Sequence, residues 1–263
     1  MRFLRLLLAL VAGVLVVFPE PAVQVRAAAP GVASAPVPTT RPRIAVIDSG
    51  IARTPELADM LIAEYDMAAD PARPPFQPAT SHGTMVATIL LREAARPVEL
   101  ISLRIDDPAG CPGGLTPPCQ GDARPIADAI RAAMRLDVDA INISLSVKDD
   151  PSIAQAVGEA ARRGIKVVLA AGNDGHDRPA NLALARAGFP NAILVGAVNP
   201  DGRPWSGTNR PEPGTPGYFY VWQEGVRIPT VLADGTEVVA TGTSFAAPIE
   251  TARLLKARRP TGS

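Results

Sequence analysis

The feature that most constrains the fold is a series of short, nearly continuous apolar runs separated by segments with helical spacing. The runs cover residues 43–48, 98–105, 140–145, 165–171 and 192–198. A strand with one face in water alternates apolar and polar residues, so continuous apolar runs indicate strands that are buried on both faces. The pattern predicts an α/β fold of three layers, in which a mostly parallel central sheet is flanked by helices.

Helix start and stop signals fall between these runs. Ser81 can cap a first helix, and Pro125 can begin a second. Asp150 and Pro151 begin a third, which Gly164 ends. Strand, helix and strand therefore repeat along the chain, as in a parallel sheet with crossover helices.

The last part of the domain has a different composition and a different predicted secondary structure. From Asp201 to Thr241 the chain is rich in Pro and Gly, with short β segments and a hairpin predicted around residues 233–235. A final helix is predicted to open at Ser244 and to continue to about Lys256.

Four polar residues stand where such a fold places functional groups. Asp48 is the last residue of the first strand, and Asn173 directly follows the strand at 165–171. His82 and Ser244 lie in the first turns of two predicted helices. Because open α/β sheets carry their sites at the carboxyl ends of the strands, we expect these residues to meet there.

The chemistry of the four residues is complementary. A serine hydroxyl is a weak nucleophile, so a base must take its proton and a carboxylate must orient that base. Ser244, His82 and Asp48 can fill these roles. A tetrahedral intermediate also carries an oxyanion, for which the Asn173 amide and the Ser244 backbone N–H are candidate donors.

The segments around these residues are IAVIDSG, SHGTMVA, AAGND and GTSFAAP, in that order. In these motifs, and in the order Asp, His, Ser, the chain resembles the subtilisin-like serine proteases from about residue 43 to 255. DVDAINISLS and GFPNAILVGAV between them also look like family segments. The resemblance implies a three-layer subtilisin-like fold and a serine endopeptidase that hydrolyses peptide bonds in extended polypeptides.

The resemblance also implies where a substrate would lie. Two strand ends are expected to bracket the side chain before the cleaved bond, with the peptide bound as an added strand. They are Ser144, Leu145 and Ser146 on one side and Ala170, Ala171 and Gly172 on the other. Many family members have Gly where this chain has Ser146, so its side chain is expected to narrow the pocket or to add a polar contact.

Other interpretations of the same residues stay open. His176, in a loop after Asn173, is a rival base that we interpret as an exposed loop residue. A catalytically impaired peptide-binding pseudoprotease would keep the same cleft without turnover. An esterase would use similar chemistry, but Ser244 lacks the G-x-S-x-G elbow of the usual esterase scaffold.

Composition excludes several classes of function. Basic and acidic residues number 26 each, which gives no electrostatic footprint for nucleic acid. With two histidines in the chain, a metal site of three or more histidines is ruled out. No cofactor or metal is expected. The sequence contains no dense Asp/Asn/Gly ladder of the kind that forms a calcium loop, so calcium is not predicted, although it is not excluded either.

The beginning of the chain predicts export. Arg2 and Arg5 precede an apolar run at residues 6–18, which has the length of a signal-peptide core and is short for a membrane span. We expect a periplasmic or extracellular protein, or a membrane-anchored one if the segment is not cleaved. The predicted parts are a signal peptide at 1–29, an Ala/Pro-rich linker at 30–42, a peptidase domain at 43–258 and a tail at 259–263.

The chain has two cysteines, Cys111 and Cys119, eight positions apart in a Pro/Gly-rich loop. In an exported protein such a pair is expected to form a disulfide, and two thiols alone do not make a zinc site. By chain order, this loop falls where the family carries an edge segment that pairs with substrate. The hypothesis is that the disulfide stiffens one rim of the cleft.

Overall fold

The structure is a computed structural model that describes residues 41–111, 118–214 and 217–257. All of them belong to one compact unit, residues 39–263. The predicted signal peptide, most of the predicted linker and the predicted tail lie outside the described residues. No helix in the described ranges is long and apolar enough to cross a membrane.

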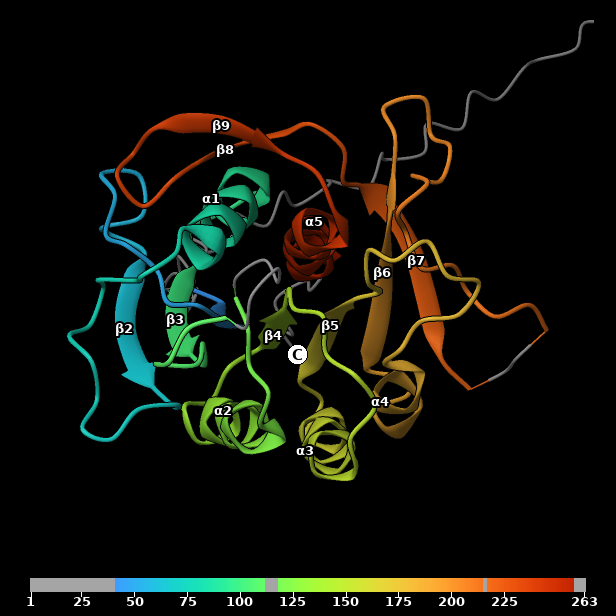
Figure 1. Ribbon diagram of the computed structural model, residues 1–263, viewed down its shortest axis with the longest axis horizontal. Helices are drawn as coiled ribbons and strands as arrows, with labels where there is room; N and C mark the ends of the chain where they lie inside the picture. Colours follow the sequence, from blue (N-terminus) through green and yellow to red (C-terminus); the bar gives the residue numbers. More distant parts are fainter. Residues whose placement is uncertain (1–40, 112–117, 215–216, 258–263) are drawn as a thin grey trace, which may run out of the picture. The chain divides into compact units, whose positions relative to one another are not determined.

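A seven-stranded parallel sheet forms the centre of the fold, in the order β2-β3-β1-β4-β5-β6-β7 (Figure 1). The strands are β1 (Arg43–Asp48), β2 (Leu61–Asp66), β3 (Glu99–Arg104), β4 (Ala140–Ile143), β5 (Lys166–Ala170), β6 (Ala192–Val198) and β7 (Phe219–Glu224). The interior strands are buried almost throughout. This confirms the parallel sheet that the continuous apolar runs predict.

Five helices cover the two faces of the sheet (Figure 1). α1 (His82–Glu93) and α5 (Thr243–Ala257) pack side by side on one face, whereas α2 (Ala123–Arg135), α3 (Pro151–Arg162) and α4 (Leu182–Ala187) cover the other. The larger apolar core lies between the sheet and α2, α3 and α4. Two smaller cores lie under α1 and α5, so the three-layer prediction is confirmed.

A short hairpin lies across the outer side of α1 (Figure 1). It consists of β8 (Ile228–Val231) and β9 (Glu237–Ala240), paired antiparallel, as predicted around residues 233–235. The Thr230 hydroxyl donates to the Met85 carbonyl at 2.8 Å. The Ala233 N–H donates to the Ser81 hydroxyl at 3.0 Å, which fixes the tip of the hairpin to the start of α1.

Three of the predicted helix starts differ from the structure; the smallest difference is at α5, which begins at Thr243 and not at Ser244. Ser81 precedes α1 but caps none of its N–H groups, because its hydroxyl accepts from the hairpin instead. α2 begins at Ala123, before Pro125, because the Asp122 carboxylate accepts the Arg124 N–H and closes the first turn. Asp150 does cap α3 as predicted, through the N–H groups of the next turn.

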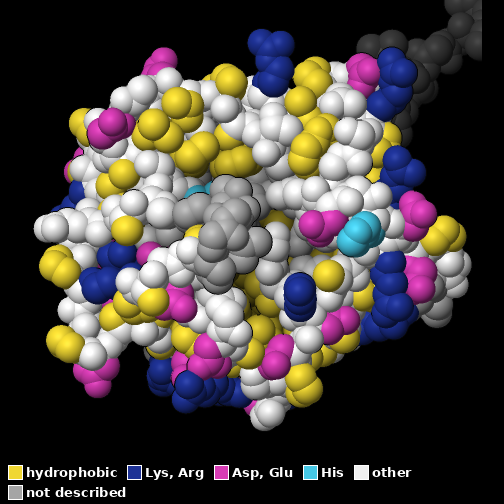
Figure 2. Space-filling view, viewed as in Figure 1, with side chains coloured by type: hydrophobic (Ala, Val, Ile, Leu, Met, Phe, Trp, Pro, Cys, Tyr) yellow, Lys and Arg dark blue, Asp and Glu magenta, His cyan; other side chains and the backbone are white. Residues whose placement is uncertain are grey.

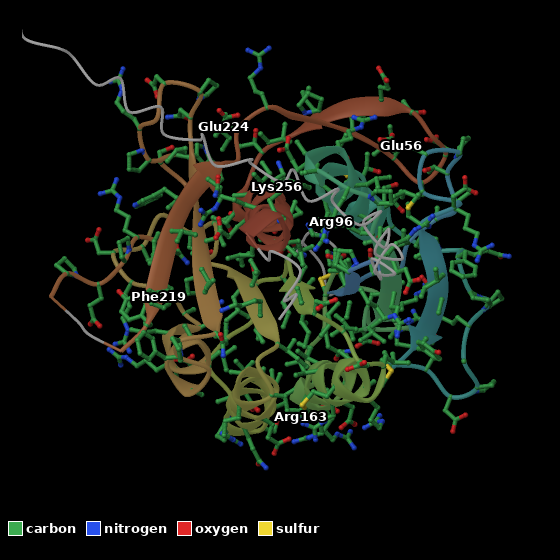
Figure 3. The ribbon with its side chains drawn as sticks, turned by 180° about the vertical axis from the view of Figure 1, so that it is seen from behind. Glu56, Arg96, Arg163, Phe219, Glu224 and Lys256 are labelled. Carbon is green, nitrogen blue, oxygen red and sulfur yellow. A yellow bond between two sulfur atoms is a disulfide. The ribbon has the colours of Figure 1, made fainter. Side chains whose placement is uncertain are left out.

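Three elements were not predicted: β2, α4 and the parallel edge strand β7. β2 and β7 each mix apolar residues with polar and charged ones, and α4, LALARA, is too short to show a helical period. Figure 3 shows β7 from behind, with Phe219 and Glu224 labelled on it.

On the face shown in Figure 2, acidic and basic side chains are interspersed and form no extended patch of one sign.

Candidate active site

The sheet order brings the predicted site residues to one edge. β1, β4 and β5 are neighbours, and their carboxyl ends carry Asp48, Ser144 and Asn173. His82 is the first residue of α1 and Ser244 is the second residue of α5. Because α1 and α5 pack against each other over these strands (Figure 1), their amino ends stand near the same sheet edge.

Asp48 and His82 form a direct hydrogen bond. The Nδ1 atom of His82 lies 2.8 Å and 3.0 Å from the two carboxylate oxygens of Asp48. The carboxylate is 1% exposed and also accepts the Ser49 N–H at 2.7 Å. Since an ionised carboxylate can only accept, Nδ1 carries the proton, and in the neutral ring Nε2 is an acceptor.

The electrostatics of His82 follow from this contact. Burial lowers the pKa of the imidazole, but the charge of Asp48 and its hydrogen bond outweigh burial and raise the pKa above its ordinary value of 6.5. The protonated ring is therefore stabilised, as a base requires when it accepts a proton beside a fixed carboxylate.

The loop after Asp48 also holds the helix that carries His82. The Ser49 hydroxyl accepts the Gly83 N–H at 3.1 Å, so a residue from another element takes the capping role predicted for Ser81. A Cβ on Gly83 would lie 2.3 Å from the Gly50 carbonyl oxygen, which only glycine avoids. Glycine directly after His82 therefore lets the start of α1 come close to the end of β1, as a glycine at this position predicts.

Ser244 lies beside this pair without a hydrogen bond to it. The side chain is at the amino end of α5, and the residue is 9% exposed. The ring of the next residue, Phe245, is centred 5.5 Å from the His82 ring, which places the start of α5 next to His82. Among the described residues, the Ser244 hydroxyl has no hydrogen-bond partner. Such contacts are often long before substrate binds.

Asn173 is fixed by its oxygen. Its Oδ1 accepts the Thr243 N–H at 2.8 Å and the Thr243 hydroxyl at 2.9 Å. A backbone N–H only donates, so the atom of the Asn173 amide that faces Thr243 must be the oxygen. The amide nitrogen lies over Gly242, where a Cβ would be 3.2 Å from it. That nitrogen donates to none of the described residues, and Asn173 is exposed. Sequence reasoning gave Thr243 no role, although it stands directly before Ser244.

The six residues predicted to line the substrate differ in exposure. Only Ser146 is exposed, whereas the other five are buried. The Ser144 hydroxyl accepts from the Asn142 amide at 2.9 Å, and Asn142 in turn accepts from Thr251 of α5. This network joins the end of β4 to α5 beneath the site.

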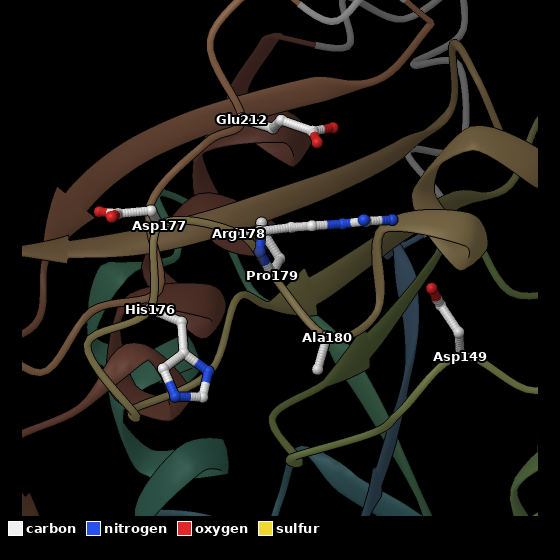
Figure 4. A pocket seen from close by; sticks show the side chains of 7 residues that line it. All are labelled: Asp149, His176, Asp177, Arg178, Pro179, Ala180 and Glu212. Atoms are coloured by element: carbon white, nitrogen blue, oxygen red, sulfur yellow. The ribbon is translucent and has the colours of Figure 1, made fainter.

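A surface pocket is lined mostly by residues that come shortly after positions 144–146 and 170–172 in the sequence (Figure 4). Its lining residues are Asp149, His176, Asp177, Arg178, Pro179, Ala180 and Glu212. The imidazole of His176 makes no hydrogen bond with a described residue, whereas Asp48 is bonded to His82. This arrangement favours His82 over His176 as the base.

The two cysteines are joined. Cys111 and Cys119 form a disulfide with their Cα atoms 5.3 Å apart, in the connection between β3 and α2. The Asp107 N–H donates to the Cys119 carbonyl at 2.9 Å and ties the connection to the end of β3. No group of three or more His, Cys, Asp or Glu side chains within the described ranges could hold a metal ion.

Comparisons with known proteins show the family and the fold of the chain. The model of the subtilase family of peptidases matches residues 40–259. Subtilisin E of Bacillus subtilis is 30% identical over 237 residues, which cover 83% of this chain and 56% of that protein. A subtilisin of Bacillus pumilus is also 30% identical, with 83% and 78% covered. The chain thus spans little more than half the length of Subtilisin E.

A similar fold occurs among solved structures. The crystal structure of a cold-adapted subtilisin-like serine proteinase aligns with a TM-score of 0.63 at 21% identity. The alignment covers 81% of this chain and 75% of that one. At this identity the likeness concerns the fold.

Proposed function

The chain belongs to the subtilase family, and on that premise we propose that it is an exported serine endopeptidase that hydrolyses peptide bonds in extended polypeptides. The observation that carries the proposal is the buried Asp48–His82 hydrogen bond, 2.8 Å long, beside the amino end of the helix that bears Ser244. A structural ion pair would not need a serine beside it at a helix terminus.

In the proposed mechanism, the Ser244 hydroxyl attacks the carbonyl carbon of the substrate. The Nε2 atom of His82 takes the hydroxyl proton and then gives it to the leaving amine, which leaves an acyl-enzyme. Water attacks the acyl group by the same route in reverse and restores the serine. Asp48 keeps the His82 ring in the tautomer and orientation that both steps need.

The negative charge of the tetrahedral intermediate requires donors that are already in place. The Asn173 amide nitrogen and the Ser244 backbone N–H serve this purpose in the proposal. Two observations support it: Thr243 holds the amide oxygen of Asn173, and Ser244 lies at the positive end of α5. Both donors are therefore oriented before substrate arrives.

The substrate is a protein or peptide that binds as an added strand between residues 144–146 and 170–172. Export rests on the charged start and apolar run at residues 1–18, with the mature protein in the periplasm or outside the cell. Retention of that segment would anchor the protein to the membrane.

Hydrolysis of casein by the purified chain, with the Ser244→Ala variant as control, tests the proposal. We expect wild-type activity to fall by about 10⁶ in the variant, close to the background rate. A serine-directed phosphonate should label the wild type once and should not label the variant. Equal casein hydrolysis by both proteins, or no hydrolysis by either, would contradict the proposed function.

A further inference from the structure

One buried polar residue outside the proposed catalytic residues is bonded to the loop that carries Asn173. Asn209 lies in the connection between β6 and β7 and is 0% exposed. A buried amide is costly unless it is fully hydrogen-bonded, so its partners show what it holds in place.

The amide oxygen, the amide nitrogen and both backbone groups of Asn209 each make a hydrogen bond, and most of these bonds face one loop. Its Oδ1 accepts the N–H groups of Asp174 and His176 at 3.1 Å and 3.0 Å. Its Nδ2 donates to the Asp174 carboxylate at 3.2 Å, and its own N–H donates to the Gly172 carbonyl at 3.0 Å. Asn209 therefore binds the chain on both sides of Asn173.

The fit between Asn209 and this loop is tight. Gly172 has a φ of 103°, and a Cβ at that position would lie 2.3 Å from the Asn209 Nδ2 atom. The space that glycine leaves empty is thus occupied by the amide of Asn209. On its other side, the Asn209 carbonyl accepts the Tyr220 hydroxyl, which anchors the residue to β7.

We propose that Asn209 is a positioning residue that orients the oxyanion donor Asn173, an inference that rests on the proposed function. Thr243 fixes the side-chain oxygen of Asn173, and its hydroxyl also accepts the Gly172 N–H at 3.2 Å. The backbone on either side of it is fixed by Asn209, so the two contacts together define where the Asn173 nitrogen points. A preorganised donor loses much of its effect when it is displaced by a fraction of an ångström.

The chemistry of the site favours an amide at position 209. The side chain must accept two N–H groups and donate to a carboxylate at the same time, which Asn can do. Asp would place a second carboxylate about 3.2 Å from that of Asp174, where like charges repel.

The test uses kcat and KM for a peptide substrate, with melting temperatures to monitor folding. We expect Asn209→Ala to lower kcat about 10-fold with KM within about twofold, because the contact acts on the transition state. Inhibition by a peptide boronic acid, which mimics the tetrahedral state, should weaken in parallel. Asp174→Ala removes one surface partner of Asn209 and should lower kcat by a smaller factor, which keeps the test valid if Asn209→Ala does not fold.

The matched control is Thr208→Val. Thr208 is the neighbouring residue and is equally buried, but among the residues that the structure describes its hydroxyl bonds only to Ala197 of β6. We expect it to lower the melting temperature and to leave kcat within about twofold. A kcat loss in Thr208→Val as large as in Asn209→Ala would show a general packing effect and would overturn the role of Asn209.

A double-mutant cycle separates positioning from stability. If Asn209 acts through Asn173, Asn209→Ala should change kcat less than about twofold in an Asn173→Ala background. Additive losses, or unchanged kcat in Asn209→Ala and Asp174→Ala with an active wild type, would overturn the inference alone. An inactive wild type would instead overturn the proposed function, and the role of Asn209 with it.

Discussion

The two halves of the candidate site are built differently. In one half, Asp48 and His82 are buried and already hydrogen-bonded, and the loop after Asp48 caps the helix of His82. In the other half, the Ser244 hydroxyl and the Asn173 nitrogen have no hydrogen-bond partner among the described residues. Thr243, however, holds the side-chain oxygen of Asn173, and Asn209 holds the backbone of the next residue, Asp174.

This difference shows which catalytic groups the fold holds by permanent side-chain contacts. The acid–base half needs one fixed tautomer in every step, so a permanent side-chain contact serves it. The other half must bind charge that exists only in the transition state, so its donors are oriented but make no permanent hydrogen bond. Substitutions in the two halves should therefore differ in size and in pH dependence.

The largest effect is expected at His82. His82→Ala removes the base, and kcat should fall by about 10⁶. The matched control is His176→Ala, which removes the other histidine of the chain and should leave kcat within a few-fold. The kcat of both variants is measured from initial rates of hydrolysis of a chromogenic peptide. Loss of activity in His176→Ala together with survival in His82→Ala would reverse the assignment.

The next largest effect is expected at Asp48. Asp48→Asn keeps the shape but loses the charge, and kcat should fall by about 10⁴ because the imidazole is no longer held in the right tautomer. In the wild type, kcat/KM should fall as pH drops through the raised pKa of His82, with a midpoint above 6.5. The variant should move this midpoint to lower pH. An unchanged midpoint would show that Asp48 does not control His82.

Stability and activity should respond in opposite directions to this titration. A raised pKa in the folded state means that the charged His82–Asp48 pair stabilises the fold below pH 6.5 and that this contribution is lost as pH rises through the folded pKa. Activity rises over the same range because the neutral ring is the base. Chemical denaturation of wild type and Asp48→Asn across this range measures the difference.

A smaller loss is expected in the other half. Asn173→Ala removes one oxyanion donor and should lower kcat by about 10² to 10³ while KM changes little. The acid limb of the pH profile should stay where it is, because Asn173 does not touch His82. A shift of that limb in Asn173→Ala would mean that the two halves are not separate. Steady-state kinetics over a pH series supply the readout.

The smallest effect is expected away from the site. Burial raises the pKa of Asp66, but hydrogen bonds from Arg73 outweigh it and lower the pKa to about 2. Its stabilisation is therefore complete above pH 3.8 and is lost as pH falls through about 2. Asp66→Asn should lower the free energy of unfolding at pH 7 by about 1 kcal/mol, after allowance for solvent screening. Unchanged kcat with a lower melting temperature is expected.

The sequence predicted the parallel sheet, because the strands at residues 43–48 and 192–198 are continuous apolar runs buried on both faces. It also predicted four polar residues at one sheet edge, since strand ends and helix starts were recognisable in single segments. The Asp48–His82 contact shows two of them together. Ser244 lies beside them, and its role stays a prediction.

What the sequence could not predict are contacts between distant segments. The Ser49 hydroxyl caps α1 in place of Ser81, which instead binds the hairpin tip. Asn209 meets the Asn173 loop across 35 positions of sequence. Short β segments were predicted between residues 201 and 241, but the parallel pairing of β7 with β6 across the Pro/Gly-rich stretch was not. No local signal marks such pairings, because they depend on tertiary packing.

The central claim is that the two halves act on one reacting carbon. A crystal structure of the protein after reaction with a peptide phosphonate tests it most directly. The account predicts phosphorus bonded to Ser244 Oγ and a phosphonyl oxygen within about 3 Å of the Asn173 nitrogen, with His82 still bonded to Asp48. Phosphorus on another residue, or a phosphonyl oxygen facing away from Asn173, would contradict it.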